Sequence, residues 1–572
     1  MSRLRHAFAS ALAVALPAAA FAQSPPPLPG VIERIAPAEP PRLGPPLLPP
    51  EPERTTGPGA QRQVTIGRVV ILGNTALPAA ALREAVAGME ARGVTLAEIE
   101  TARLAVLRAY RAAGFPYVAV GAALAPLAEG GAELRLPVTE GFVAEVVIEG
   151  EAGPAARQAR RFLDRLVGQR PLPNAALERA LLLASDIPGV TARGLLRPMP
   201  GAAGALQLVV RLDRRAVSGF ANLDNRGYRL TGAWQGLLVG QVNALTGAGE
   251  RTEIALLQTD GNGQSFVQAT EELFLGGSGL RLRALAGFGR AEPGSPLAAI
   301  GYAGETRVAG VGLSYPLVRS RPLNLTLHGQ FDAFESTVEA RDGPGLPRVR
   351  QSRDAVRALR LGLEGAFQDA WLGRAPAAAA TTGTLRLSQG IEALGASDGG
   401  SGRAARADSE FGFTRIVAEA TRLQPLFVPA EGWLVSVQAT LAGQWSDDVL
   451  PPAEKFYLGG NRLGRGFYAG QVSGDRALGG SVELQAGTVF PLPGLRLGTQ
   501  FYLFRDEGRG FDNEPGGAER SLASWGGGVR LQFDERVQLD LEAVRRLTRS
   551  PEGAGVARLD EDALFARVLV RF

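Results

Sequence analysis

The stretch that decides the fold is residues 524–533, SWGGGVRLQF, in which apolar and polar positions alternate. As a strand it presents two unlike faces, which are Trp525, Val529, Leu531 and Phe533 on one side, and Ser524, Arg530 and Gln532 on the other. A period of two with charge on one face only is expected where one face meets lipid and the other a watery lumen. We therefore interpret this stretch as a β-strand that crosses a membrane.

The same alternation recurs throughout residues 216–572, where Gly, Pro, Asp and Asn break the chain into short segments. We predict sixteen strands, near residues 217–226, 231–242, 251–260, 263–274, 280–290, 304–315, 323–338, 352–368, 379–391, 410–424, 432–444, 478–490, 495–505, 522–533, 537–548 and 560–572. Short connections alternate with longer ones, which is typical of an outer-membrane barrel with short periplasmic turns. The predicted fold class is a membrane β-barrel of about 16 antiparallel strands, with a soluble β-sandwich as the alternative. Such a barrel encloses a lumen wide enough for an aqueous channel or for a plug.

The C-terminus fits the same interpretation. Leu564, Val568, Val570 and Phe572 share one face of the last predicted strand. A terminal aromatic residue on an alternating strand resembles the signal by which the barrel assembly machinery recognises outer-membrane barrels for insertion. The alternative is that Phe572 is simply the end of an apolar strand.

Two small modules precede the barrel, at residues 64–140 and 141–214. Each follows the order β-α-α-β-β, and in the first module Thr95 and Glu98 form a capping box that opens a helix. We expect helices over residues 79–86, 95–113, 155–167 and 174–185, and strands over residues 64–72, 117–124, 132–138, 142–148, 190–197 and 205–212, with Asn174 as a helix cap. This pattern resembles the POTRA domain. An unrelated pair of periplasmic α+β domains is the alternative.

The longest predicted outer loop, residues 445–477, carries the sequence Gly464-Arg465-Gly466-Phe467. This run resembles the [VL]RG[FY] signature in the sixth outer loop of polypeptide-transporting outer-membrane barrels, and the strand count also makes this the sixth outer loop. Gly464 departs from the signature, because Val or Leu is usual there. The alternative is a solvated arginine in a glycine-rich loop.

A second motif lies on the barrel wall. Residues 501–508, FYLFRDEG, resemble the F-x-D-x-G motif of the same barrels through Phe504, Asp506 and Gly508. The resemblance implies that the loop folds inward and that Arg465 meets Asp506. A guanidinium offers a planar fork that matches a carboxylate, which makes this pairing chemically reasonable.

Together, two POTRA-like modules and sixteen strands resemble the two-partner secretion transporters (TpsB type) of the ShlB/FhaC/HecB-like haemolysin secretion/activation family, in the BamA-related superfamily. Residues 223–232 also resemble their first barrel hairpin. The resemblance implies a Gram-negative outer-membrane protein that captures a large, β-helical exoprotein in the periplasm and secretes it through the barrel. Members often begin with a helix that plugs the pore. In this chain the start is rich in proline, and residues 31–36 are the only candidate for a short helix of this kind. An assembly factor, a passive porin and an enzyme with His328 as base are the alternatives.

The N-terminal sequence and the composition further limit the location, cofactors and partners that we expect for this chain. Residues 1–22 have the basic start, apolar run and small-residue end of a signal peptide, and the proline-rich residues 23–60 form a linker. The chain has no cysteine, two histidines and a net charge of +4, so we expect no metal, no cofactor and no nucleic-acid partner. Outer-membrane lipid is an expected partner. No phosphate-binding loop is found, so we expect no enzyme.

Overall fold

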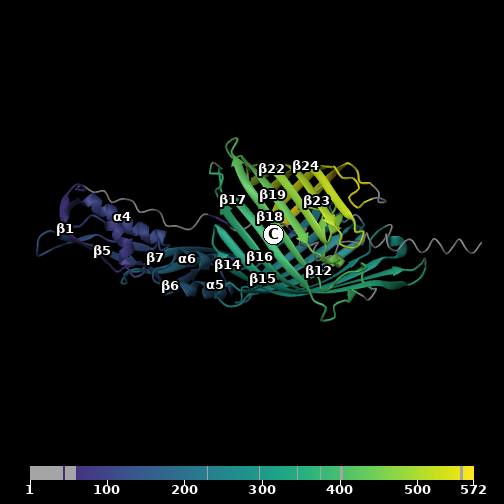
Figure 1. Cartoon of the computed structure of the whole chain (residues 1–572), viewed down its shortest axis with the longest axis horizontal. Helices are drawn as coiled ribbons and strands as arrows, with labels where there is room; N and C mark the ends of the chain where they lie inside the picture. The colour runs from purple at the N-terminus through teal and green to yellow at the C-terminus, as the bar shows by residue number, and fades with distance from the viewer. Residues whose placement is uncertain are drawn as a thin grey trace, which may run out of the picture.

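The structure is a computed structural model that describes residue 36 and residues 43–44, 59–228, 230–294, 297–343, 345–373, 375–399, 403–553 and 558–572. The predicted signal peptide, the predicted helix at 31–36 apart from Ala36, and most of the predicted linker lie outside these residues. Figure 1 shows two parts, an elongated arm of mixed α and β elements and a large barrel.

The barrel is closed by sixteen strands, in the order β10 to β19, then β22 to β26, then β9. Neighbours are antiparallel throughout, and β26 closes on β9. The bounds are β9 Val217–Asp224, β10 Gln235–Asn243, β11 Arg251–Thr259, β12 Gln264–Phe274, β13 Arg281–Ala291, β14 Ala303–Arg319, β15 Leu323–Arg341, β16 Arg348–Asp369, β17 Ala379–Gly390, β18 Thr414–Phe427, β19 Leu434–Trp445, β22 Arg476–Leu492, β23 Leu495–Phe511, β24 Glu519–Phe533, β25 Val537–Arg546 and β26 Asp562–Arg571. The predicted fold class, a sixteen-stranded barrel behind POTRA-type modules, is confirmed.

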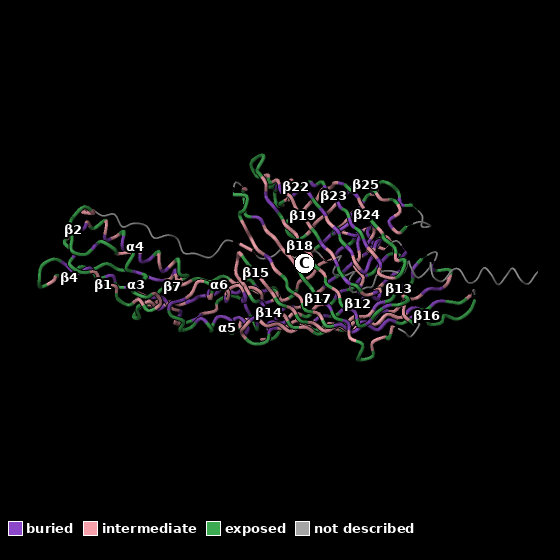
Figure 2. The backbone as a smooth tube through the Cα atoms, in the orientation of Figure 1, coloured by how far each residue is buried: buried purple, intermediate pink, exposed green. Residues whose placement is uncertain are grey.

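The alternation in β24 sorts its side chains as expected. Trp525 is 47% exposed on the outer face, whereas Ser524 is fully buried towards the lumen. Figure 2 shows buried segments gathered inside the barrel beneath β22–β25, so this sector of the lumen is filled. The lipid-facing wall is therefore apolar, and the polar face meets other parts of the protein.

Several strands are longer than predicted, among them β22, β23 and β24 and, elsewhere in the wall, β14, β15 and β16. β14, β15 and β16 have 17, 19 and 22 residues. β15 and β16 extend past the predicted 323–338 and 352–368 mainly at their outer ends, to Arg341 and from Arg348, where charged residues interrupt the apolar–polar alternation while the strand pairing continues. The prediction followed hydrophobicity and therefore stopped too early at the outer ends of β15 and β16, whereas on β14 it missed the periplasmic end, which continues to Arg319.

The first module has the bounds β1 Gln63–Leu72, α3 Ala79–Arg83, η1 Glu84–Val86, β2 Arg92–Thr95, α4 Leu96–Ala112, β3 Val118–Val120, β4 Ala123–Pro126 and β5 Ala132–Glu140. Its sheet runs β2-β1-β5-β3, with β4 also pairing β5. The capping box of Thr95 and Glu98 is present at the start of α4. The single predicted strand at 117–124 is wrong, because it divides into β3 and β4, and the prediction missed β2. No helix in the described part of the chain is long and apolar enough to cross a membrane.

The second module has the bounds β6 Phe142–Glu149, α5 Ala155–Leu163, η2 Asp164–Leu166, α6 Asn174–Ser185, β7 Val190–Pro198 and β8 Ala205–Arg214. Its sheet runs β6-β8-β7. The predicted cap at Asn174 is wrong, since Pro173 precedes the helix and Asn174 is its first residue. The side chain of Asn174 instead accepts a hydrogen bond from the Tyr117 hydroxyl at 3.1 Å, which joins the two modules.

The second module is fixed against the periplasmic turns of the barrel. The Phe162 ring meets the Phe274 ring edge-on, with centroids 5.1 Å apart. Arg319, at the end of β14, binds both carboxylate oxygens of Asp186 at 2.7 Å. The Arg179 guanidinium donates to the Pro316 carbonyl at 2.7 Å. These contacts place the modules at the end of the barrel with short turns (Figure 1).

Candidate functional site

The loop between β19 and β22 folds into the barrel. It contains a short hairpin, β20 Phe456–Leu458 and β21 Val472–Gly474. Leu458, Phe467 and Val472 are fully buried and pack with Leu522 of the wall strand β24. This apolar burial contributes to holding the loop in the lumen.

Arg465 at the tip of the loop reaches the predicted partner on the wall. Its Nη2 lies 2.9 Å from Asp506 Oδ1, and its Nε donates to Oδ2 at 3.1 Å. The backbone amides of Gly464 and Arg465 donate to the same Oδ2 at 3.1 and 2.8 Å. The exposed fractions of the two side chains are 7% and 0%, so this two-pronged contact is shielded from water.

Two further wall residues complete the network around this arginine. The guanidinium of Arg465 forms an ion pair with Glu483 and lies 3.6 Å from the centre of the Phe504 ring. Glu483 is also bound by Arg530 at 2.6 Å. Sequence reasoning placed Arg530 on the polar face of its strand but assigned neither Arg530 nor Glu483 to the site. Their inward position on strands flanking the Asp506 strand was the available signal.

The glycines of the two motifs are sites of close approach. Gly464 has φ +82°, a conformation that disfavours side chains, and this explains why Val or Leu is absent there. A Cβ on Gly466 would lie 2.7 Å from the Ser524 Cβ, and one on Gly508 would lie 2.8 Å from Leu458. Gly508 therefore leaves room for the loop hairpin against the wall.

A second arginine joins the tip of the loop to the seam where the barrel closes. Arg226 follows β9 and donates to the Arg465 carbonyl at 2.8 Å. Its guanidinium forms an ion pair with Glu542 and lies 4.0 Å from the centre of the Phe565 ring. Sequence reasoning noted this stretch only as a likeness to a first hairpin. It missed the role of Arg226 because nothing in the spacing links it to a loop more than two hundred residues away.

The base of the loop is held separately. Glu454 is bound by Arg360 at 2.7 Å and by Arg415 at 2.8 Å. The only lysine of the chain, Lys455, lies 2.6 Å from Asp512. The loop is thus attached to the wall at the tip and at the base by different strands.

Part of the lumen remains open beside the loop. A cavity of about 450 Å³ lies between Arg462 of the loop and wall residues that include Arg283 and Arg386. Ala36 also borders it. The amide of Gly44 donates to the Arg321 carbonyl at 3.0 Å, at a periplasmic turn. Ala36 thus borders the lumen, and Gly44 lies at its periplasmic end.

The last predicted site residue, Phe572, lies at the seam between β26 and β9. It is 54% exposed, and its backbone exchanges two hydrogen bonds with Gly219, at 2.9 and 3.0 Å. The terminal residue thus extends the pairing that closes the barrel. Among the described residues, no group of acidic or histidine side chains is arranged to hold a metal ion.

Comparisons with known proteins agree with this architecture. Residues 291–531 match the family model described as haemolysin secretion/activation protein ShlB/FhaC/HecB, and residues 64–141 match the POTRA domain of ShlB type. A curated relative, the heme/hemopexin transporter protein HuxB of Haemophilus influenzae, is 22% identical over 253 residues. That match spans 44% of this chain and 44% of the relative.

Two solved structures share the fold over nearly the whole chain. CdiB from Escherichia coli has a TM-score of 0.71 at 20% identity, covering 93% of this chain and 94% of that one. CdiB from Acinetobacter baumannii has a TM-score of 0.61 at 17% identity, covering 89% and 90%. Their arm and barrel are therefore arranged as they are here.

Proposed function

We propose that this chain, which belongs to the haemolysin secretion/activation family, secretes a partner exoprotein through its own barrel. The chain is a Gram-negative outer-membrane protein with its POTRA modules in the periplasm. The observation that carries the proposal is the loop, which enters the lumen and is held there by Arg465 and Asp506. A loop in this position narrows the lumen, so a polypeptide cargo passes only when the loop moves aside.

The proposed capture site is the arm. In the second module β6 and β7 are the two edge strands of the sheet, and Val167 bridges the outer side of β6 at Val143, so β7 presents the open edge. An extended cargo segment can add to such an edge through main-chain hydrogen bonds. A long β-helical exoprotein suits this route, because it crosses the lumen unfolded and its folding outside supplies the driving force. The proposal contains no catalytic step and no nucleotide.

The test is export of a cargo encoded beside this gene. We expect the exoprotein in the medium when the full chain is expressed, and its retention in the periplasm when residues 64–214 are deleted. Heat-dependent gel mobility of the barrel checks that the deletion variant still folds and inserts. Equal export with and without the chain would refute the proposal. Unchanged export together with a general loss of other outer-membrane proteins would identify an assembly factor instead.

A further inference from the structure

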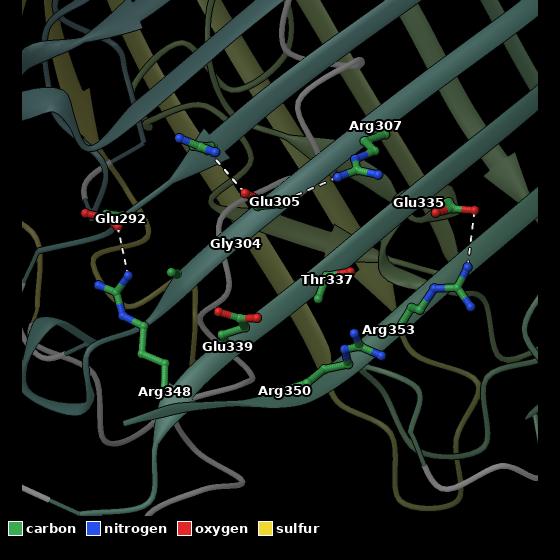
Figure 3. A pocket seen from close by; sticks show the side chains of 12 residues that line it. Glu292, Gly304, Glu305, Arg307, Glu335, Thr337, Glu339, Arg348, Arg350 and Arg353 are labelled. Carbon is green, nitrogen blue, oxygen red and sulfur yellow. Dashed lines mark hydrogen bonds and ion pairs between the residues drawn. The ribbon is translucent and has the colours of Figure 1, made fainter. Parts of the chain in front are cut away.

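A group of charged residues lies on the outside of the barrel, at the outer ends of β13–β16. We call this group the outer ladder, and it consists of Arg290, Glu292, Glu305, Arg307, Glu335, Thr337, Glu339, Arg348, Arg350 and Arg353. These residues line a hollow of about 480 Å³, shown in Figure 3. The hollow lies on the opposite face of the wall from the lumen, and the proposed secretion mechanism does not use it.

Strand register shows that the ladder faces away from the lumen. Glu305 and Arg307 share one face of β14 with Val311 and Leu313, which are 48% and 47% exposed on the wall. The neighbouring strand continues the row, because Arg307 pairs with Glu335 of β15. The side chains therefore project from the outer wall rather than into the pore.

The height of the ladder follows from the apolar row beneath it. On β15 the outward positions from Leu323 to Ala333 are apolar or glycine, and Glu335 is the first charged one. Ten residues of strand span about 33 Å, which at a tilt of about 40° is about 25 Å of membrane thickness. This is the height of the apolar band of outer-membrane barrels. The ladder therefore begins where the hydrocarbon of the outer leaflet ends.

Several charges of the ladder neutralise one another. Arg290 lies 3.2 Å from Glu305, Arg348 lies 3.1 Å from Glu292, and Arg353 lies 3.3 Å from Glu335. Arg307 and Arg350 are the two arginines of the outer ladder that do not belong to these close pairs. Figure 3 shows Arg307 on β14 and Arg350 on β16, with β15 between them.

The guanidinium groups of these two arginines are available to bind a ligand. Arg307 is 69% exposed and reaches only Glu305, at 3.8 Å, a carboxylate already shared with Arg290. Arg350 forms no ion pair with any residue that the structure describes, and Figure 3 draws no contact for it. A guanidinium in such a position is suited to the planar recognition of a phosphate.

We propose that the outer ladder binds the phosphorylated headgroup of an outer-leaflet glycolipid. Arg307 and Arg350 bind its phosphates, and the Thr337 hydroxyl and Glu339 carboxylate face its sugar hydroxyls. The acyl chains then lie along Val311 and Leu313, directly below the hollow. A lipid fits better than a soluble anion because the charged hollow continues without a break into the lipid-facing wall.

The experiment uses the full-length protein in detergent and native mass spectrometry. The probes are diphosphoryl lipid A, the same lipid without phosphates, and inorganic phosphate. The test variant is Arg307→Gln with Arg350→Gln, which removes two charges without adding repulsion. Arg509→Gln is the matched control, because Arg509 on β23 is also 69% exposed and lies 3.6 Å from its single partner, Glu519. Heat-dependent gel mobility reports the barrel fold of every variant.

We expect the wild type and Arg509→Gln to retain diphosphoryl lipid A, and the double variant to bind it about tenfold or more weakly. The lipid without phosphates should bind all three proteins equally and weakly. Equal retention of diphosphoryl lipid A by a folded double variant would overturn the proposal and leave a self-contained row of ion pairs. Displacement of the lipid by inorganic phosphate at equal concentration would also overturn it, because the site would then recognise a free anion.

Discussion

Arginine–carboxylate pairs occupy two contrasting regions of this barrel, beneath the inward-folded loop and on the outer ladder. Beneath the loop, the Arg465 and Asp506 side chains are 7% and 0% exposed. On the ladder, those of Arg353 and Glu335 are 43% and 33% exposed. The groups are chemically the same, but water screens only the second pair, so breaking the first leaves a buried charge. Exposure to water, rather than the number of ion pairs, therefore decides in which region the loss of a pair has the larger effect.

The largest effect is expected from Arg465→Ala, which tests the shielded region. It leaves Asp506 and Glu483 without the shared guanidinium, at a cost of about 3–5 kcal/mol to the docked loop. We expect the loop to leave its place, single-channel conductance in a planar bilayer to rise, and export to fail while barrel abundance stays near normal. Arg465→Lys should rescue poorly, because an ammonium cannot reproduce the fork.

Arg505→Ala is the control for that variant. Arg505 precedes Asp506 on the same strand, but its side chain is 54% exposed and its ion-pair partner is the nearby Glu507. It should leave conductance and export unchanged. A double-mutant cycle with Asp506→Ala sharpens the test, because effects of the two substitutions that simply add would show that Arg465 and Asp506 act independently.

A smaller effect is expected from Gly464→Ala, which strains the tip without changing any charge. The positive φ of Gly464 and the approach of a new Cβ to within 2.8 Å of Leu522 oppose docking, by about 2–4 kcal/mol together. Gly494→Ala is the control, because it has φ +74° with nothing within 4 Å of the new Cβ. Conductance should rise for Gly464→Ala only. An equal rise for both variants would mean that backbone strain alone, and not the fit at the wall, is measured.

The contrast between lipid-facing and water-facing regions also explains which parts of the structure could be predicted from the sequence. Strand positions were predictable wherever one face meets lipid, because hydrophobicity then alternates with every residue, as in β24. The contact of Arg465 with Asp506 was predictable because both residues belong to recognisable motifs. Hydrophobicity fails where both faces meet water, which is why the outer ends of β15 and β16 were missed.

Contacts between distant residues without a motif were not predictable. Glu483, Arg530 and Arg226 converge on the loop only because the closed barrel places their strands around it. The spacing of these residues along the chain does not indicate that they converge on the loop. Similarly, Asn174 resembled a helix cap by residue type, whereas the contact with Tyr117 that occupies its side chain depends on how the two modules meet.

A third variant, Glu140→Gln, tests a buried carboxylate that has no arginine partner in its side-chain contacts. Glu140 is 4% exposed at the end of β5. It accepts hydrogen bonds from the Thr75 amide at 2.8 Å, the Ala76 amide at 2.9 Å and the Tyr110 hydroxyl at 2.8 Å. We expect the soluble fragment 59–214 to fold alone. In this fragment Glu140→Gln should lower the free energy of unfolding at pH 7 by about 1–3 kcal/mol relative to the wild type, measured by urea denaturation.

The pH dependence of this loss has a defined sign. Burial raises the pKa of Glu140, but the hydrogen bonds from Thr75, Ala76 and Tyr110 outweigh it and hold the pKa below its ordinary value. The stabilisation is therefore fully present above the pKa of the unfolded chain and is lost as the pH falls through the lower folded value. The difference between wild type and Glu140→Gln should shrink in acid. A difference that stays constant from neutral to acidic pH would show that the charge of Glu140 is not what stabilises the fold.

The smallest effect is expected from Arg353→Ala on the outer ladder. Both members of its pair with Glu335 are partly exposed, so solvent and salt already screen the attraction, and exposed pairs contribute about 0–1 kcal/mol. The remaining carboxylate stays in contact with water and with Arg357, whose guanidinium donates to Glu335 at 2.8 Å. Thermal unfolding of the full-length protein should therefore shift only slightly, and conductance should not change. A loss of stability as large as that of Arg465→Ala would show that the outer wall shields its charges as well as the inner wall does, and the contrast between the two regions would disappear.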